Sequence, residues 1–243
     1  MTATWATLVR VLSQLRRDPR TIVLIVGVPC LLETLLQQLF RGRPEVFQHV
    51  GAPLLGLFPF VSMFVVTSVT MLRERTSGTL ERLMTMPLAK LDVLGGYAGA
   101  FALLAVVQAT VVSLLAFGVL GLDVAGPQWA VVALAVANAT LGMALGLFLS
   151  AFATTEFQAV QFMPAIVLPQ FLLCGLFVAR SDMAEWLRVV SALLPLTYAY
   201  DALAKVAAGG PYGARFVVDV AVILGSVVLA LALGAATLKR RTD

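Results

Sequence analysis

The chain has 243 residues, of which 60% are hydrophobic and 12% are charged, and it carries a formal net charge of +4. A soluble domain has about 25% charged residues, so this composition excludes an ordinary water-soluble fold and indicates a chain built for lipid. The single histidine and the two cysteines, both of which lie inside apolar runs, exclude a histidine-based metal cluster or catalytic triad and a disulfide framework.

Residues 1–20 predict an interfacial helix. Apolar side chains recur there at helical spacing, and the arginines lie off that stripe, which is typical of a helix on an anionic membrane surface and not of a signal peptide. Trp5 is expected at headgroup depth, and Asp18-Pro19 should end the helix. The stripe consists of Trp5, Leu8, Val9, Leu12 and Leu15, and the arginines are Arg10, Arg16, Arg17 and Arg20.

Six apolar segments follow, each near the ~20 residues needed to cross about 30 Å of hydrocarbon. Their expected bounds are 21–40, 53–72, 92–120, 128–150, 159–179 and 215–238. At membrane depth each backbone polar group must be satisfied within the segment, so all six are predicted to be helices. In the fourth span, Asn138, Gly142, Gly146 and Ser150 recur every four residues, which favours close helix packing.

A polar interruption, residues 73–90 with the sequence RERTSGTLERLMTMPLAK, separates the second and third spans. Gly78 is expected to act as an N-cap, Glu81 falls at the third helical position, and Pro87 should end a short amphipathic helix. Such a helix can lie at the membrane surface and pass force from a cytoplasmic partner to the spans. An ordinary solvated loop is the alternative interpretation, and both remain open from the residues alone.

Residues 180–213 contain an apolar stripe that is too short to span the membrane. Trp186 belongs to this stripe, and Pro195 and Gly209-Gly210-Pro211 interrupt the region. We therefore expect one or two short interfacial or re-entrant helices that enter from the outer face after the fifth span.

The distribution of lysine and arginine predicts that both termini and residues 73–90 are cytoplasmic, because basic residues accumulate on that side of a membrane protein. An even number of spans agrees with this topology. The predicted inner side holds Arg10, Arg16, Arg17, Arg20, Arg73, Arg75, Arg82, Lys90, Lys239, Arg240 and Arg241, and the outer side holds Arg41, Arg43, Arg180, Arg188, Lys205 and Arg215.

Polar residues inside the spans are candidate functional groups. Glu33 lies in the outer half of the first span, and an intramembrane carboxylate usually faces a cavity or a partner. The alternative is that Glu33 reaches outward to water or pairs with Arg41 or Arg43. Gln170 in the fifth span is explained more often by an interhelical hydrogen bond than by a substrate. Phenylalanines of the second and fifth spans are either packed or line an apolar pathway, namely Phe58, Phe60, Phe64, Phe162 and Phe171.

The chain contains neither a G-x-x-x-x-G-K-[ST] motif nor a G-x-G-x-x-G motif after a strand, so any nucleotide that drives it is expected on another chain. No catalytic pair is found inside the spans, and no basic stripe suggests nucleic acid binding. An ion-driven carrier usually needs several intramembrane ionisable groups, and Glu33 is almost alone, which disfavours that class.

Two stretches resemble the ABC-2 type exporter permeases. RERTSGTLERLMTMPLAKLDVLGGY is similar to the family's signature of an acidic residue, then Gly-Thr-Leu-Glu, then Met-Pro-Leu and the next span. MPAIVLPQFLLCGLFVARSDMAEWLRVVSALLPLTYAYDAL resembles the fifth span and the outer re-entrant helices of the same family. The resemblance covers the whole chain and is nearest to the daunorubicin-resistance and multidrug permeases.

This resemblance implies a single all-α transmembrane domain over 1–243, with six spans, in a bacterial-type cytoplasmic membrane. Two permease copies, expected as a homodimer, would bind two copies of an ATP-binding subunit that carries ATP and Mg, while this chain binds no cofactor and no metal. The implied cargo is an amphipathic drug or a lipid-like molecule, and the alternative cargo is a lipid-linked glycan or another lipid. An ion-coupled secondary carrier is the alternative class of protein. The resemblance also implies that the segment 73–90 is the coupling helix that seats in a groove of the ATPase, with Glu74, Arg75, Gly78, Thr79 and Glu81 as coupling residues. The residues that it implies near a substrate route through spans one, two and five are Glu33, Phe60, Phe64, Phe162 and Gln170.

Overall fold

The computed structural model describes residues 3–79 and 90–237, and this part of the chain contains helices and no strands. The all-α prediction is therefore confirmed. The long helices are α1 (Ala3–Arg16), α2 (Pro19–Leu39), α3 (Pro44–Thr76), α5 (Lys90–Gly118), α6 (Gln128–Leu149) and α11 (Ala214–Thr237). The shorter ones are η1 (Ser150–Phe152), α7 (Glu156–Phe162), η2 (Met163–Val167), α8 (Leu168–Leu173), η3 (Arg180–Asp182), α9 (Glu185–Ala192) and α10 (Pro195–Ala207).

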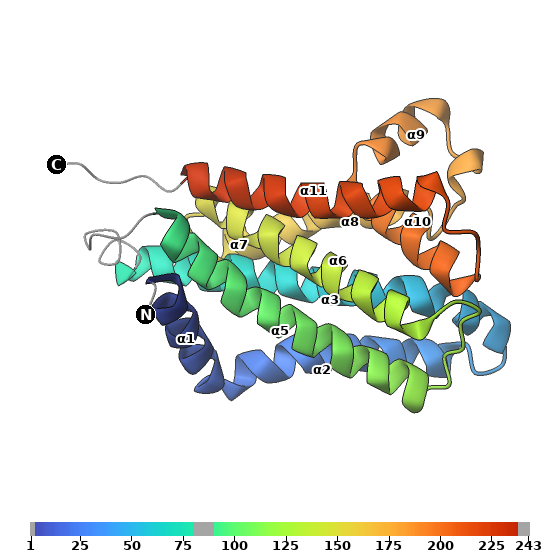
Figure 1. Cartoon of the computed structure of the whole chain (residues 1–243), viewed down its shortest axis with the longest axis horizontal. Coiled ribbons are helices and arrows are strands. Elements are labelled where there is room, and N and C mark those ends of the chain that lie inside the picture. Colours follow the sequence, from blue (N-terminus) through green and yellow to red (C-terminus); the bar gives the residue numbers. More distant parts are fainter. Residues whose placement is uncertain (1–2, 80–89, 238–243) are drawn as a thin grey trace.

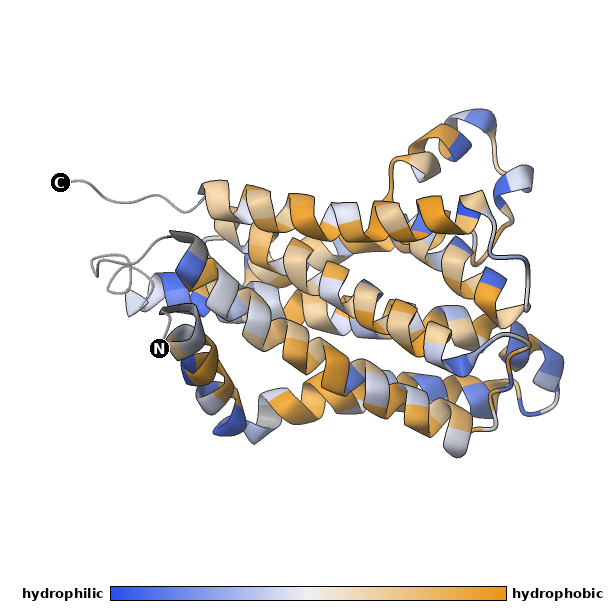
Figure 2. Cartoon of the chain, viewed as in Figure 1, coloured by the Kyte–Doolittle hydropathy of each residue, from blue (hydrophilic) through white to orange (hydrophobic). Residues whose placement is uncertain are grey.

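Five of the described helices are long and apolar enough to cross a membrane, and α9 with α10 adds a sixth if this pair, bent by 89°, is one broken span. The long helices run side by side as an elongated bundle, with α1 across one end and α9 projecting at the other (Figure 1). Hydrophilic residues gather at these two ends, while the middle of the bundle is mostly hydrophobic (Figure 2). This distribution is that of a multi-pass membrane protein. The two ends are called the α1 end and the α9 end below.

The predicted fifth span is an interrupted helix. Residues 156–173 are helical throughout, but a π-helical turn, η2, separates α7 from α8. Pro164 and Pro169 lack the N–H that a regular α-helix needs, and the N–H of Leu168 donates to the carbonyl of Met163, five residues earlier. The segment ends at Leu173 and not at 179, because Gly175 leaves helical geometry with φ of 109°, at a place where an added Cβ atom would lie 3.0 Å from a ring carbon of Tyr200.

The second span is longer at both ends than the predicted 53–72. Helix α3 starts at Pro44, continues through Pro53 and Pro59, and ends at Thr76. Prolines are tolerated in membrane helices where neighbouring helices satisfy the freed carbonyls, so Pro53 does not mark a boundary. Residues 73–76 of the predicted coupling segment consequently belong to α3.

Helices α3 and α6 form the centre of the bundle through the predicted small residues of α6. A Cβ atom on Gly142 would lie 2.2 Å from the carbonyl oxygen of Phe60, and one on Gly146 would lie 2.5 Å from that of Phe64. Only glycine permits this separation of the two backbones. The close contact also fixes which face of α3 is buried against α6.

Candidate functional site

A polar cluster joins α1 to the last turn of α3 and the first turns of α5. Glu74 on α3 is 8% exposed and accepts a hydrogen bond from the Tyr97 hydroxyl at 2.7 Å. It also accepts one from Nε2 of Gln14 at 3.3 Å and forms an ion pair with Nη2 of Arg10 at 3.5 Å. Arg10 in turn donates to the Tyr97 hydroxyl. We call these four residues, Arg10, Gln14, Glu74 and Tyr97, the Glu74 clamp.

Close packing and one more hydrogen bond hold α1 along α5. A Cβ atom on Gly96 would lie 2.5 Å from Cβ of Thr7, so the two helices approach closely there. Oγ1 of Thr4 donates to Oδ1 of Asp92 at 3.0 Å. Trp5 and Val9 remain exposed on the opposite face of α1. Helix α1 is thus bound to the spans along one face and presents apolar side chains along the other.

The end of α3 is also connected to the start of α7. Nε and Nη2 of Arg73 donate to the two carboxylate oxygens of Glu156 at 2.7 and 2.9 Å. Both side chains are more than half exposed, so this pair contributes little to stability. The hydrogen bond from Arg73 holds the pKa of the Glu156 carboxyl below its ordinary value.

A cavity of about 310 Å³ opens beside the Glu74 clamp at the α1 end. It lies between α1, the start of α2, the end of α3 and α5, and Gln14, Glu74 and Tyr97 of the clamp line it. Its lining residues are Val11, Gln14, Leu15, Asp18, Thr21, Thr70, Arg73, Glu74, Ser77, Thr79 and Tyr97.

An apolar groove of about 420 Å³ lies within the bundle between α2, α3 and the η2–α8 segment. All of its described lining residues except Ser62 are apolar. Helix α2 contributes Leu24, Val28 and Leu32; α3 contributes Phe58, Val61, Ser62, Val65 and Val66; and η2 with α8 contributes Met163, Val167, Leu168 and Phe171. The groove can accept the apolar body of a ligand and offers one hydroxyl for orientation.

Ser62, the polar residue among the described groove lining, belongs to a hydrogen-bond cluster around a proline in α2. Pro29 has no N–H, so the carbonyl of Ile25 lacks its helical donor. Nε2 of Gln108 on α5 donates to that oxygen at 2.7 Å, and the Ser62 hydroxyl of α3 donates to it at 3.1 Å. Gln108 also donates to Ser62 at 2.8 Å. One freed carbonyl thereby connects three helices beside the groove.

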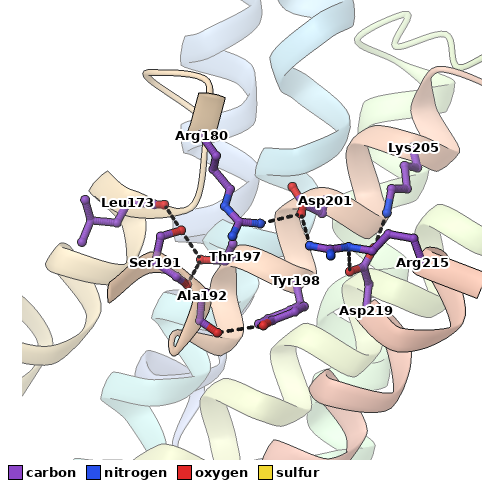
Figure 3. A network of polar contacts seen from close by, with 10 residues as sticks. All are labelled: Leu173, Arg180, Ser191, Ala192, Thr197, Tyr198, Asp201, Lys205, Arg215 and Asp219. Carbon is purple, nitrogen blue, oxygen red and sulfur yellow. Dashed lines mark hydrogen bonds and ion pairs between the residues drawn. The ribbon is translucent and has the colours of Figure 1, made fainter. Parts of the chain in front are cut away.

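At the α9 end, ion pairs fasten the region 180–213 to the last long helix (Figure 3). Asp201 of α10 pairs with Arg180 at 3.2 Å and with Arg215 of α11 at 3.9 Å. Asp219 of α11, fully buried, pairs with Lys205 of α10 and with Arg215 at 3.5 Å. Ion pairs thus connect η3, α10 and α11.

The corner between α9 and α10 is held by hydroxyl groups. The Ser191 hydroxyl donates to the Leu173 carbonyl of α8 at 2.9 Å, and Thr197 donates to the Ser191 carbonyl at 2.7 Å (Figure 3). Tyr198 donates to the Ala192 carbonyl at 2.7 Å. The predicted short helices are therefore anchored to the end of the interrupted fifth span.

Comparison with known proteins identifies the family to which this chain belongs. A family model described as ABC-2 type transporter matches residues 2–207. The chain belongs to the ABC-2 type transporter family. It is 27% identical over 173 residues, 71% of this chain, to ABC transporter G family member 20 of Dictyostelium discoideum. It is 25% identical over 169 residues, 70% of this chain, to the protein named "Probable multidrug ABC transporter permease YbhR" of Escherichia coli strain K12.

The chain spans 24% of the length of the Dictyostelium relative and 46% of that of the E. coli relative. Membership of the family agrees with the multi-pass membrane architecture of the described helices. The resemblance that the sequence motifs carried is confirmed.

In this ABC-2 fold the residues expected to couple to an ATPase lie around the end of α3. Glu74 points into the clamp, and Arg75 is partly buried with no hydrogen-bond partner for its Nε among the described residues. Gly78 has φ of +72° and follows the last turn of α3, where its N–H donates to the Arg75 carbonyl. Thr79 shares a hydrogen bond of 2.9 Å with Ser77, and Glu81 lies outside the described residues.

The residues expected near the ABC-2 substrate route are only partly brought together. Phe60 and Phe64 are fully buried on the α6 side of α3 and do not line the groove. Phe162 packs half-buried at the end of α7, and Gln170 is 4% exposed and donates to the Ile166 carbonyl at 3.2 Å. Glu33 is fully buried on α2, with neither an ion pair nor a hydrogen bond to Arg41 or Arg43 in the described structure.

Most residues on the groove-lining face of α3 could not be predicted from the sequence. Phe58 is one of its members and was open as a pathway residue from sequence, but Val61, Val65 and Val66 carry no distinguishing signal. The usable signal lies on α6, because Gly142 and Gly146 require the close backbone contact that turns Phe60 and Phe64 away from the groove.

Proposed function

We propose that this chain is the membrane-spanning permease subunit of an ATP-driven exporter that moves amphipathic drugs or lipid-like molecules out of the cytoplasm or its inner leaflet. ATP and Mg are bound by a separate ATP-binding subunit, of which two copies serve two copies of the permease. The protein lies in a bacterial-type cytoplasmic membrane, with its α1 end on the cytoplasmic side, where most of its basic residues are.

The apolar groove is the observation that carries this proposal. Its volume of about 420 Å³ falls in the range of ~300–1,000 Å³ that small-molecule sites occupy. It lies between helices α2, α3 and α8, and its described lining residues other than Ser62 are apolar. A molecule that partitions into lipid can reach such a groove without crossing a polar barrier.

The Glu74 clamp supports the part of the proposal in which the ATP-binding subunit moves the helices of the permease. Residues 80–89 connect α3 to α5, and the clamp joins the last turn of α3 to both α5 and α1. A movement imposed on that connection by an ATP-binding subunit therefore reaches three helices at once. ATP and substrate must favour different arrangements of these helices for transport to be driven.

A lipid, or the lipid portion of a lipid-linked glycan, is the second candidate cargo. The groove favours it because all its described lining residues except Ser62 are apolar, which suits an acyl chain as well as a drug. Transport assays with a fluorescent phospholipid and with an amphipathic dye separate the two candidates.

Filling the groove should block transport. Val65→Trp places an indole in the groove, and we expect transport to fall about tenfold or more, the factor that ~1.4 kcal/mol of lost binding free energy gives. Val228→Trp is the matched control, since Val228 is 67% exposed on α11 and should tolerate the same change. Equal transport by the two variants would show that the groove is not on the route.

ATP hydrolysis in proteoliposomes tests the partnership. The ATP-binding subunit encoded beside this chain is reconstituted with and without the permease, and hydrolysis is measured over a panel of amphipathic compounds. We expect the permease to bind the subunit and to make its hydrolysis responsive to some of these compounds. A permease that neither binds the subunit nor alters hydrolysis would overturn the proposal and favour a standalone carrier.

A further inference from the structure

The exposed side of α1 combines apolar and basic residues. Trp5 is 51% exposed and Val9 is 42% exposed, and Arg16 lies on the same side of the helix, since residues four and seven apart share a face. Arg17, which directly follows the last residue of α1, is exposed as well. Helix α1 contains no acidic residue. This side of the helix is therefore both apolar and positively charged.

The structure divides the apolar stripe predicted for α1 between two surroundings. Leu15 is 7% exposed and packs in the core of the bundle. Leu8 lies against α5, where a Cβ atom on Gly99 would meet its Cδ1 atom at 3.0 Å. The contacts of α1 with the bundle thus use one part of the stripe and leave Trp5 and Val9 for another partner.

The acidic residues that the structure describes at the α1 end are engaged within the protein. Asp18 accepts hydrogen bonds from the backbone N–H and the hydroxyl of Thr21, at 3.2 and 2.6 Å. The other carboxylates accept the hydrogen bonds given above, and they belong to Glu74, Asp92 and Glu156. By contrast, the guanidinium groups of Arg16 and Arg17 have no ion pair within residues 3–79 and 90–237. Two positive charges are thus left for a partner outside the described chain.

The position of α1 indicates the kind of partner. Arg17 and Asp18 alone join α1 to α2, whose membrane-crossing stretch starts at Thr21. Helix α1 lies across the end of the bundle (Figure 1), so this connection holds it at the depth where α2 enters the hydrocarbon. At that depth a tryptophan ring is favoured because it is amphipathic, and basic side chains are attracted to anionic lipids.

We propose that the exposed side of α1 binds anionic phospholipids of the membrane leaflet at the α1 end. Arg16 and Arg17 contact the headgroup phosphates, and Trp5 and Val9 lie at the start of the acyl chains. The apolar side chains bind any lipid, and the two arginines provide the preference for negative charge. Because α1 also carries two residues of the Glu74 clamp, the lipid binds a helix that is attached to the last turn of α3. The inference involves neither a transported substrate nor an ATP-binding subunit, so it is independent of the proposed function.

Quenching of Trp5 fluorescence by brominated lipids tests this inference on the full-length chain. The chain has three tryptophans, so Trp129→Phe with Trp186→Phe leaves Trp5 alone. The protein is placed in nanodiscs of mixed phosphatidylglycerol and phosphatidylcholine, and one lipid or the other carries bromine on its acyl chains. We expect phosphatidylglycerol to be preferred beside Trp5 at least fivefold, the factor that ~1 kcal/mol for a basic residue near an anionic surface gives. Arg16→Gln with Arg17→Gln should abolish this preference, while both brominated lipids still quench Trp5.

A variant that keeps only Trp129, through Trp5→Phe with Trp186→Phe, is the matched control. Trp129 is 74% exposed at the start of α6, a helix that contains no charged residue. We therefore expect the two brominated lipids to quench Trp129 equally.

Equal quenching of Trp5 by the two lipids, an undiminished preference after loss of both arginines, or the same preference at Trp129 would overturn the inference. Absence of quenching by either lipid would also overturn it and would show that protein covers this side of α1. If the variant with Arg16→Gln and Arg17→Gln does not fold, salt replaces it as the test. Raising the salt to about 1 M, where the Debye length is ~3 Å, should lower the preference of the protein that keeps both arginines, and an unchanged preference would contradict the inference.

Discussion

Gly142→Ala should destabilise the bundle strongly. The new methyl carbon would lie 2.2 Å from the carbonyl oxygen of Phe60 and 2.9 Å from its carbonyl carbon, and a backbone cannot move aside as a flexible side chain can. Helices α3 and α6 must separate to accommodate it, which costs about 1–3 kcal/mol or more in a well-packed core. Thermal unfolding of the purified protein, followed by the loss of native Trp fluorescence or by aggregation, measures the effect.

Gly225→Ala is the matched control for that substitution. A Cβ atom on Gly225 of α11 meets nothing within 4 Å, and alanine favours a helix over glycine by up to about 1 kcal/mol. The control should therefore unfold at the wild-type temperature or above it. A Gly142→Ala variant as stable as Gly225→Ala would contradict the close α3–α6 contact.

Glu74→Ala should both destabilise the α1 end and uncouple the permease. The substitution removes the acceptor of the Tyr97 hydroxyl, which belongs to a fully buried side chain, and the counter-ion of Arg10. A buried group left without its hydrogen bond costs about 1–3 kcal/mol. Helix α1 then loses its polar attachment to α3, and movement of the 80–89 connection no longer reaches it. Thermal unfolding and substrate-dependent ATP hydrolysis are the two measurements.

Glu156→Ala separates a specific role of the clamp from a general loss of charge. It too removes a glutamate that pairs with an arginine, but that pair is more than half exposed, so its loss should cost ~0–1 kcal/mol. We expect Glu156→Ala to unfold at the wild-type temperature and to support the same substrate-dependent ATP hydrolysis by the ATP-binding subunit. Equal behaviour of Glu74→Ala and Glu156→Ala would show that the clamp has no distinct part in coupling.

The helical architecture could largely be predicted from sequence because long apolar runs have few alternatives in lipid. Five predicted spans correspond to α2, α3, α5, α6 and α11. Prolines accompany two differences from the predicted spans: Pro53 lies inside α3, and Pro164 and Pro169 flank the π turn that interrupts the fifth span. Whether a proline ends, kinks or merely occupies a membrane helix depends on the neighbours that satisfy the freed carbonyl.

The candidate site was less accessible to sequence reasoning. The resemblance to the family indicated which spans form the substrate route. It did not indicate which face of α3 lines the groove, because this helix has apolar residues on all its faces and hydropathy does not distinguish Val65 from Phe64. The clamp depends on Arg10 and Tyr97 meeting Glu74 in space, and no local pattern reveals that meeting. Glu33 is the exception, since a carboxylate in an apolar run is conspicuous without any structure.

Uptake of an amphipathic fluorescent dye into inside-out membrane vesicles tests the proposed function most directly. The vesicles contain the permease with the ATP-binding subunit, the permease alone, or the pair with Val65→Trp in the groove. We predict ATP-dependent accumulation of the dye only with both subunits present, and its loss in the Val65→Trp variant. Accumulation by the permease alone, driven by an ion gradient and unaffected by ATP, would contradict an ABC exporter and require a different energy source.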